Sequence, residues 1–167
     1  EAILDRYAFQ LSGGMAQRVT IALALCSQAK LLIADEPTNG LDQDSKQQTL
    51  SLLNDLFPDA AKLVITHDIS VAATCGRILV LCGGKMLETG SSALVLAAPR
   101  HPYTQALFDS IPSVDTIGIN SLKTLEGQIP SPINPPSGCP FHPRCFAAMA
   151  ECASAVPEAR DITQNGH

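Results

Sequence analysis

The spacing of apolar side chains changes several times along the first 70 residues and predicts alternating helices and strands. Residues 14 to 28 carry apolar side chains at three- and four-residue steps and on the other faces too, which predicts a deeply packed helix. Two unbroken apolar runs, KLLIAD and KLVITHD, predict strands buried on both faces of a parallel sheet. Residues 42 to 57, between the runs, predict an amphipathic helix capped by Asp42. The alternation indicates an α/β fold.

The pattern after Arg77 differs and predicts a hairpin followed by short helices. RILVLCGGKMLETG reads as two strands around a Gly-Gly turn. Helical segments are expected near residues 91 to 98 and 103 to 111. Residues 113 to 138 lose periodicity and include the proline-rich PSPINPPSG. We therefore expect three parts, residues 1–90, 91–137 and 138–167.

Composition narrows the classes of partner. Of the 167 residues, 46% are hydrophobic and 16% are charged, which is ordinary for a globular chain. The net charge is −5 without a basic cluster, which argues against nucleic acid or anionic lipid as a partner. Cys26, Cys75 and Cys82 lie among apolar residues and are expected to be buried.

The ends of the two predicted strands carry the first candidate chemistry. LLIADE places Asp35 and Glu36 at the carboxyl end of a strand, where open α/β sheets bind ligands. Adjacent side chains on an extended backbone point to opposite sides, so one carboxylate is expected to hold Mg²⁺ and the other to orient an attacking water. His67 ends the second strand and is expected at the same edge. Taken singly, Asp35 and Glu36 are more often the polar end of a strand that leaves the core, and His67 is more often a surface histidine.

A second candidate is the start of the first helix, QLSGGMAQRV. Ser12 can cap the helix, and Gly13 and Gly14 allow a phosphate to approach the backbone N–H groups. The alternative is a capped helix start with no ligand. A phosphate loop is missing from the sequence, because the one Gly-Lys pair, Gly84-Lys85, is followed by methionine within the predicted hairpin turn.

In combination, LSGGMAQRV, LLIADEPTNGLD and LVITHD closely resemble the second half of the nucleotide-binding domain of ATP-binding cassette proteins. The resemblance implies a P-loop-type domain with a parallel sheet flanked by helices, and ATP and Mg²⁺ as cofactors. It assigns the Mg²⁺ ligand to Asp35, the catalytic carboxylate to Glu36 and the switch histidine to His67. The residues that it places against the nucleotide are Ser12, Gly13, Gly14 and Gln17 of the signature motif and Asp42 of the D-loop.

The same resemblance implies how a chain without a phosphate loop can act on ATP. In this family two nucleotide-binding domains meet head to tail, and the signature motif of one covers ATP lying on the phosphate loop of the other. We therefore expect the phosphate loop upstream of Glu1, and we expect this chain alone to be inactive as an ATPase.

The later segments APRHPYTQALFDSIP and LEGQIPSPINPPSGCPFHPRC resemble the C-terminal extension of the subfamily that powers import of oligopeptides, dipeptides or nickel. This resemblance implies a peripheral subunit at the cytoplasmic face of the inner membrane. Its partners would be a second ATPase subunit, two membrane permeases and, indirectly, an extracytoplasmic solute-binding protein. The alternatives are a soluble cassette ATPase of DNA repair or translation, and a truncated module without catalytic activity.

Three cysteines near the C-terminus form a candidate metal site. Cys139, Cys145 and Cys152 have C-x5-C-x6-C spacing, which suits a 4Fe-4S cluster or zinc. Either site usually needs a fourth ligand, for which His142 or His167 are candidates. A structural or degenerate motif, or a disulfide, is the alternative.

Overall fold

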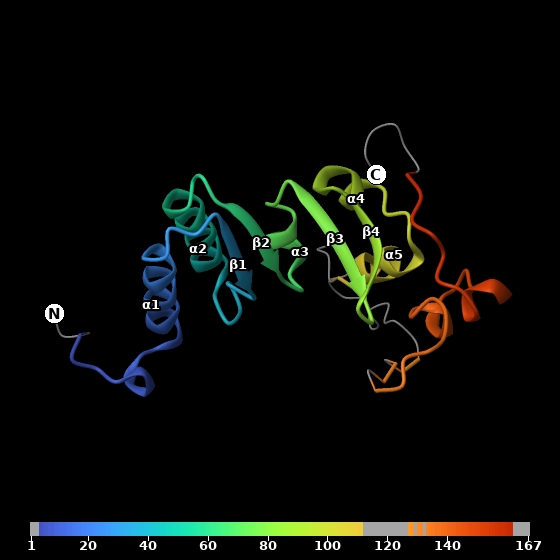
Figure 1. Ribbon diagram of the computed structural model, residues 1–167, viewed down its shortest axis with the longest axis horizontal. Coiled ribbons are helices and arrows are strands. Elements are labelled where there is room, and N and C mark those ends of the chain that lie inside the picture. Colours follow the sequence, from blue (N-terminus) through green and yellow to red (C-terminus); the bar gives the residue numbers. More distant parts are fainter. Residues whose placement is uncertain (1–3, 112–126, 129, 132, 162–167) are drawn as a thin grey trace, which may run out of the picture. The chain divides into compact units, whose positions relative to one another are not determined.

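The computed structural model describes residues 4–111, 127–128, 130–131 and 133–161, which form two compact units (Figure 1). The first unit is Glu1–Val71 and the second is Ala72–His167. A short helix, α3 (Ile69–Ala72), lies where the units divide.

The first unit has a two-stranded parallel sheet with a helix between its strands in the sequence. Its elements are a 3-10 turn (Ala8–Gln10), α1 (Gly13–Leu25), β1 (Leu31–Asp35), α2 (Gln43–Leu56) and β2 (Ala61–Ile65). In the sheet, Ile33 pairs with Leu63 and Asp35 pairs with Ile65. The predicted parallel pair, and with it the α/β fold class, is confirmed.

Local capping chemistry sets the ends of α2. The Asp42 side chain accepts a hydrogen bond from the Ser45 N–H at 2.9 Å, and the helix ends before Phe57 and Pro58. Leu53 and Phe57 are buried, each with 5% of its surface exposed. The predicted cap is therefore confirmed.

Helix α1 begins as predicted, but its packing differs from the prediction. The Ser12 hydroxyl accepts a hydrogen bond from the Met15 N–H at 3.3 Å. None of the residues of α1 is buried, and Leu23 is 67% exposed. The prediction of a deeply packed helix is wrong for this chain, because a helix that is apolar on every face needs neighbours on several sides. The described part of the first unit does not surround it.

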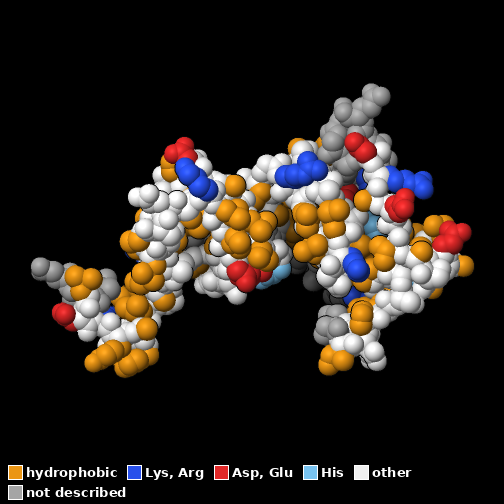
Figure 2. Space-filling view, viewed as in Figure 1, with side chains coloured by type: hydrophobic (Ala, Val, Ile, Leu, Met, Phe, Trp, Pro, Cys, Tyr) orange, Lys and Arg blue, Asp and Glu red, His pale blue; other side chains and the backbone are white. Residues whose placement is uncertain are grey.

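The strands also differ from the prediction that both faces are buried. On one face of the sheet Leu31, Ile33, Leu63 and Ile65 remain between 48% and 58% exposed. Figure 2 shows apolar side chains gathered over this sheet. A two-stranded sheet buries both faces only when a layer lies on each side. Within the described residues the sheet is covered on one side, as the partly buried Leu32 and Val64 indicate.

The second unit is built around the predicted hairpin. Strands β3 (Arg77–Cys82) and β4 (Lys85–Ser91) pair antiparallel around Gly83 and Gly84, whose φ angles are 53° and 75°. These positive φ values are the geometry for which a Gly-Gly turn is suited. The predicted helices are α4 (Ser92–Ala97) and α5 (Pro102–Asp109), and 3-10 turns follow at His142–Arg144 and Ala150–Ala153.

Phe141 joins the cysteine-bearing segment to the rest of the second unit. Its side chain is 1% exposed, and its ring lies edge-on to that of Tyr103 at 5.1 Å between centroids. The buried Glu88 carboxylate, in turn, accepts hydrogen bonds from the N–H groups of Arg100 at 2.8 Å and His101 at 3.0 Å. These contacts connect β4, α5 and the segment around Phe141.

One further expectation, the burial of three cysteines, can be compared with the structure. Cys26 is exposed and Cys75 and Cys82 are half-buried, so the prediction that all three are buried is wrong. Cys26 lies at the end of the uncovered helix α1, which accounts for its exposure. Of the aperiodic segment 113–138, residues 113–126, 129 and 132 lie outside the described residues, whereas PSPINPPSG is described apart from residue 132. Among the described helices, none combines the length and the apolar character needed to cross a membrane.

Candidate active-site edge

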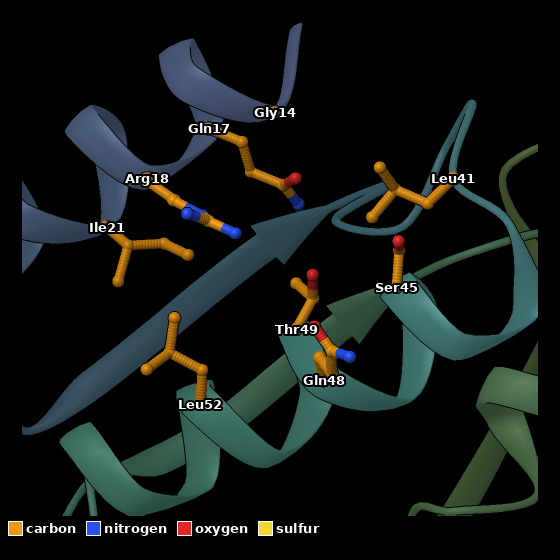
Figure 3. Close-up of a pocket in the computed structure, with 9 residues that line it drawn as sticks. All are labelled: Gly14, Gln17, Arg18, Ile21, Leu41, Ser45, Gln48, Thr49 and Leu52. Carbon is orange, nitrogen blue, oxygen red and sulfur yellow. The ribbon is translucent and has the colours of Figure 1, made fainter.

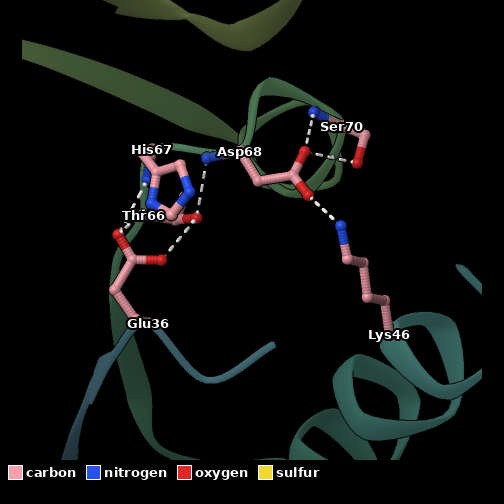
Figure 4. A network of polar contacts seen from close by, with 6 residues as sticks. All are labelled: Glu36, Lys46, Thr66, His67, Asp68 and Ser70. Carbon is pink, nitrogen blue, oxygen red and sulfur yellow. Dashed lines mark hydrogen bonds and ion pairs between the residues drawn. The ribbon is translucent and has the colours of Figure 1, made fainter. Parts of the chain in front are cut away.

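The carboxyl ends of β1 and β2 bring Glu36 and His67 into direct contact (Figure 4). His67 Nδ1 lies 2.7 Å from Glu36 Oε1, and the His67 N–H donates to the same oxygen at 3.0 Å. The Thr66 hydroxyl donates to Glu36 Oε2 at 3.5 Å. The prediction that Glu36 and His67 share one edge of the sheet is confirmed.

The backbone turns sharply at Glu36. Its N–H donates to the carbonyl of Ile65 at 2.8 Å, and its φ angle is 46°. A positive φ is uncommon for a residue other than glycine, and such strain is concentrated at functional sites. The expectation that Asp35 and Glu36 point to opposite sides assumed an extended backbone, and this assumption is wrong at Glu36.

Hydrogen bonding controls the charge of the Glu36 carboxyl. The hydrogen bond with the His67 side chain lowers the pKa of Glu36, and the hydrogen bond from the His67 backbone acts in the same direction. Glu36 is therefore ionised at neutral pH. Its side chain is 31% exposed, so water can reach a carboxylate that is able to accept a proton.

Asp35 lies beside this pair at the end of β1 and is exposed. A carboxylate open to solvent at a strand end suits Mg²⁺, which usually binds to one or two carboxylates together with phosphate oxygens and water. The carboxylates of Asp35 and Glu36 therefore fit a hard cation in their chemical type.

The serine-glycine turn is open to solvent. Ser12, Gly13 and Gly14 are all exposed, and a side chain built on either glycine would meet no atom within 4 Å. Gln17, one turn further along α1, donates a hydrogen bond from its side-chain amide to the Pro37 carbonyl. This bond connects the helix to the turn that follows Glu36.

A cavity of about 480 Å³ lies between α1 and α2 (Figure 3). Gly14 and Leu41 line it, so it adjoins both the serine-glycine turn and the turn before α2. Gln17 and Arg18 project toward it from α1, and Ser45 and Thr49 project from α2.

The Asp42 carboxylate already accepts hydrogen bonds as the N-cap of α2. Both of its carboxylate oxygens interact with Ser45, through the backbone N–H and the hydroxyl, each at 2.9 Å. These hydrogen bonds lower the pKa of Asp42. The structure thus shows a capping role for this residue in the free chain.

Sequence reasoning did not single out an ion pair beside His67. Lys46 Nζ pairs with Asp68 Oδ2, while Asp68 Oδ1 accepts from the N–H of Ser70 at 2.9 Å and from its hydroxyl at 2.6 Å. The Lys46 and Ser70 hydrogen bonds lower the pKa of Asp68 from 3.8 to about 2. The spacing of Asp68 and Ser70 is typical of an Asx-turn and could have been read from the sequence, whereas the partner from α2 could not.

The three C-terminal cysteines do not form a metal site in the structure. Among the described residues, which include Cys139, Cys145 and Cys152, no group of three or more His, Cys, Asp or Glu side chains is placed to hold a metal ion. Cys139 is buried, and its N–H donates to the Cys152 carbonyl at 2.8 Å. The His142 ring bonds to the Cys139 carbonyl at 2.9 Å, and His167 lies outside the described residues. The 4Fe-4S and zinc hypotheses are therefore unsupported. The contacts that hold the cysteine-bearing segment include backbone hydrogen bonds and the packing of the Phe141 side chain.

Comparison with known proteins matches both ends of the chain to family models. Residues 1–39 match the model described as ABC transporter. Residues 87–152 match the model described as the C-terminal region of oligopeptide/dipeptide transporters.

Curated relatives resemble nearly the whole chain. A Brucella ovis protein whose name describes a peptide import ATP-binding protein is 42% identical over 98% of this chain and 52% of its own length. The dipeptide transport ATP-binding protein DppD of Caldanaerobacter subterraneus is 43% identical, with 95% and 49% covered. The oligopeptide transport ATP-binding protein OppD of Escherichia coli is 44% identical, with 92% and 46% covered. The chain thus spans about half the length of the curated relatives that it matches.

A solved structure, the dimer of an ATP-binding cassette bound to ADP and phosphate in a post-hydrolysis state, aligns with a TM-score of 0.46 and 38% identity. The alignment covers 50% of this chain and 37% of that one.

Proposed function

Because the chain belongs to the ABC transporter ATPases that carry an oligopeptide/dipeptide transporter C-terminal region, we propose that the complete subunit hydrolyses ATP to drive peptide import. The observation that carries this proposal is the contact between Glu36 and His67 at the carboxyl end of the parallel strands. It gives an ionised carboxylate and an imidazole at the position where α/β sheets act on ligands. The names of the relatives support peptides as the cargo.

In the proposed reaction, Glu36 orients a water molecule and accepts its proton as the water oxygen attacks the terminal phosphorus of ATP, and the bond from that phosphorus to the bridging oxygen breaks to release ADP. His67 holds the Glu36 carboxylate through Oε1 and can donate a hydrogen bond to a phosphate oxygen when its ring turns. Asp35 would hold Mg²⁺, which neutralises charge on the phosphates. These roles are assigned to the side chains from their chemistry and their place at the strand ends.

The signature residues have a separate proposed role. Ser12, Gly13 and Gly14 present a capped helix start to solvent, and the exposed backbone there suits an anion. We assign this surface, with Gln17 and Asp42, to ATP held on the phosphate loop of a second ATPase subunit in a head-to-tail dimer. This chain on its own is accordingly proposed to be inactive.

The wider assembly follows from the same proposal. Residues 1–90 would belong to the nucleotide-binding domain, residues 91–137 would form a helical connector, and residues 138–167 would form the transporter-type extension. The subunit would dock from the cytoplasm onto two membrane permeases served by an extracytoplasmic solute-binding protein.

Peptide uptake by cells tests the proposed function. A strain lacking the full-length subunit should regain uptake of labelled di- or oligopeptides when the wild-type gene is supplied, and should not regain it with the Glu36→Gln variant. Labelled nickel serves as a separate arm, because the subfamily resemblance includes nickel importers. Restored nickel uptake without peptide uptake would contradict the assignment to peptides.

A further inference from the structure

Lys46 and Asp68 connect two elements that the proposed reaction needs. Lys46 is in the first turns of α2, and its N–H donates to the carbonyl of the cap residue Asp42 at 2.9 Å. Asp68 follows His67 directly and lies 22 positions after Lys46 in the sequence. The side chains of the pair are only 24% and 23% exposed, so the ion pair is better shielded from water than most surface pairs.

The segment that carries His67 is fixed on both sides of the histidine. Before it, the Thr66 hydroxyl accepts from the Asp68 N–H at 3.0 Å and donates toward Glu36. After it, Asp68 uses one oxygen for Ser70 and the other for Lys46 (Figure 4). The contacts of Asp68 with Thr66 and Ser70 are between residues two positions apart in the sequence. Its contact with Lys46 is to a residue of α2.

We propose that Lys46 and Asp68 are positioning residues: their ion pair holds the turn after β2 so that His67 stays on Glu36, and it links that turn to the helix capped by Asp42. The consequence for catalysis rests on the proposed ATPase function. The positioning itself does not, because it concerns contacts within this chain. Lys46 and Asp68 act through His67 and are not expected to touch ATP.

The contact is tested first in this chain by NMR of the His67 ring. The Glu36→Ala variant, which lacks the carboxylate, supplies the reference spectrum for a lost contact. We expect Lys46→Met to move the His67 resonances toward that reference, and Lys46→Arg to leave them near their wild-type positions. Lys62→Met is the matched control, because Lys62 is an exposed lysine of β2. Unchanged His67 resonances in Lys46→Met would overturn the inference.

The catalytic consequence is tested in the full-length subunit assembled with its transporter. Misplacing a catalytic group by about 1 Å can cost about 10²-fold, so Lys46→Met should lower kcat by about 10- to 100-fold with the KM for ATP within about twofold. Lys46→Arg should regain most of the rate. The double variant Lys46→Met/Asp68→Asn should be no slower than the slower single variant, because both changes break one interaction.

The two measurements separate the inference from the function on which it rests. If kcat of Lys46→Met equals that of Lys62→Met, the positioning role in catalysis is wrong even when ATP hydrolysis is confirmed. If the wild-type subunit does not hydrolyse ATP, the proposed function and the catalytic consequence fall together. The NMR comparison then still decides whether the ion pair holds His67.

Discussion

At the residue scale, the two oxygens of the Glu36 carboxylate have different surroundings. Oε1 receives both contacts from His67, at 2.7 and 3.0 Å, while Oε2 has the long 3.5 Å contact to the Thr66 hydroxyl. Oε2 is therefore the oxygen better able to accept a hydrogen bond from an incoming water. A neutral amide at this position could still contact His67, but it could not take a proton.

The Glu36→Gln variant of the full-length subunit should therefore hydrolyse ATP about 10²- to 10⁴-fold more slowly, the usual contribution of a positioned base. ATP binding should change little, because the substitution keeps the size of the side chain. Steady-state phosphate release and nucleotide titration measure the two quantities. Glu151→Gln is the control, since Glu151 is an exposed acid in a 3-10 turn. Equal turnover in the two variants would remove Glu36 from the mechanism.

Asp68 should make the stability of the first unit depend on pH. Its pKa is lowered from 3.8 to about 2 in the folded chain by Lys46 and Ser70. A lowered pKa means that the folded state is stabilised above the unfolded pKa of 3.8, and that this stabilisation is lost as the pH falls toward about 2. Because the pair is partly exposed, we expect a loss of about 1 kcal/mol.

Urea unfolding of this chain over the same pH range measures this loss. In the Asp68→Asn variant the part of the pH dependence that belongs to Asp68 should disappear. If wild type and variant lose the same free energy of unfolding as the pH falls, the ion pair does not stabilise the fold.

The candidate functional residues divide into those that a local pattern predicts and those that it does not. Asp35, Glu36 and His67 follow apolar runs, and parallel pairing of those runs is enough to place them at one edge. The contact of Lys46 with Asp68 depends on how α2 packs against the strand end, which no local pattern encodes. The turn at Glu36 was missed for a related reason, because alternation along a strand applies only where the backbone stays extended.

At the element scale, α2 should depend measurably on its N-cap. Asp42 satisfies the Ser45 N–H, which would otherwise lack a partner within the helix. Asp42→Ala should lower the free energy of unfolding by about 0.5–2 kcal/mol. Gln47→Ala, at an exposed position inside the same helix, is the control and should change it little. Equal losses in the two variants, measured by urea unfolding, would mean that the cap contributes nothing.

The attachment of the cysteine-bearing segment should depend on Phe141. The Phe141 side chain is 1% exposed and packs against the ring of Tyr103. The side chain of Phe146, in the same segment, is 72% exposed. Phe141→Ala should destabilise the second unit by about 3–5 kcal/mol, as is usual for a buried aromatic side chain. Phe146→Ala should cost less than about 0.5 kcal/mol. Thermal or chemical unfolding of both variants makes the comparison, and similar losses would show that Phe141 is not the anchor.

Element positions were predicted better than element burial. The hairpin around Gly83 and Gly84 and the caps at Ser12 and Asp42 were predicted, because each depends on residues close together in the sequence. The packing of α1 and of the sheet was not, because burial depends on which neighbours are present. Apolar runs predict that a surface tends to be covered, and they do not say what covers it.

At the scale of the whole molecule, the chain combines the Glu36–His67 contact at the sheet edge with an open serine-glycine turn, and its sequence contains no phosphate loop. It spans about half the length of its curated relatives. Under the proposed function, Glu36 and Ser12 thus act on a triphosphate that other parts of the assembly hold. The claim that follows is that neither the catalytic carboxylate nor the serine-glycine turn acts without a phosphate loop supplied from outside this chain.

Mg²⁺-dependent ATP hydrolysis by the purified 167-residue chain, compared with the full-length subunit, tests that claim most directly. We expect turnover by the full-length subunit and, from the isolated chain, no more phosphate release than from its own Glu36→Gln variant. Hydrolysis by the isolated chain at a rate near that of the full-length subunit, abolished by Glu36→Gln, would contradict the claim.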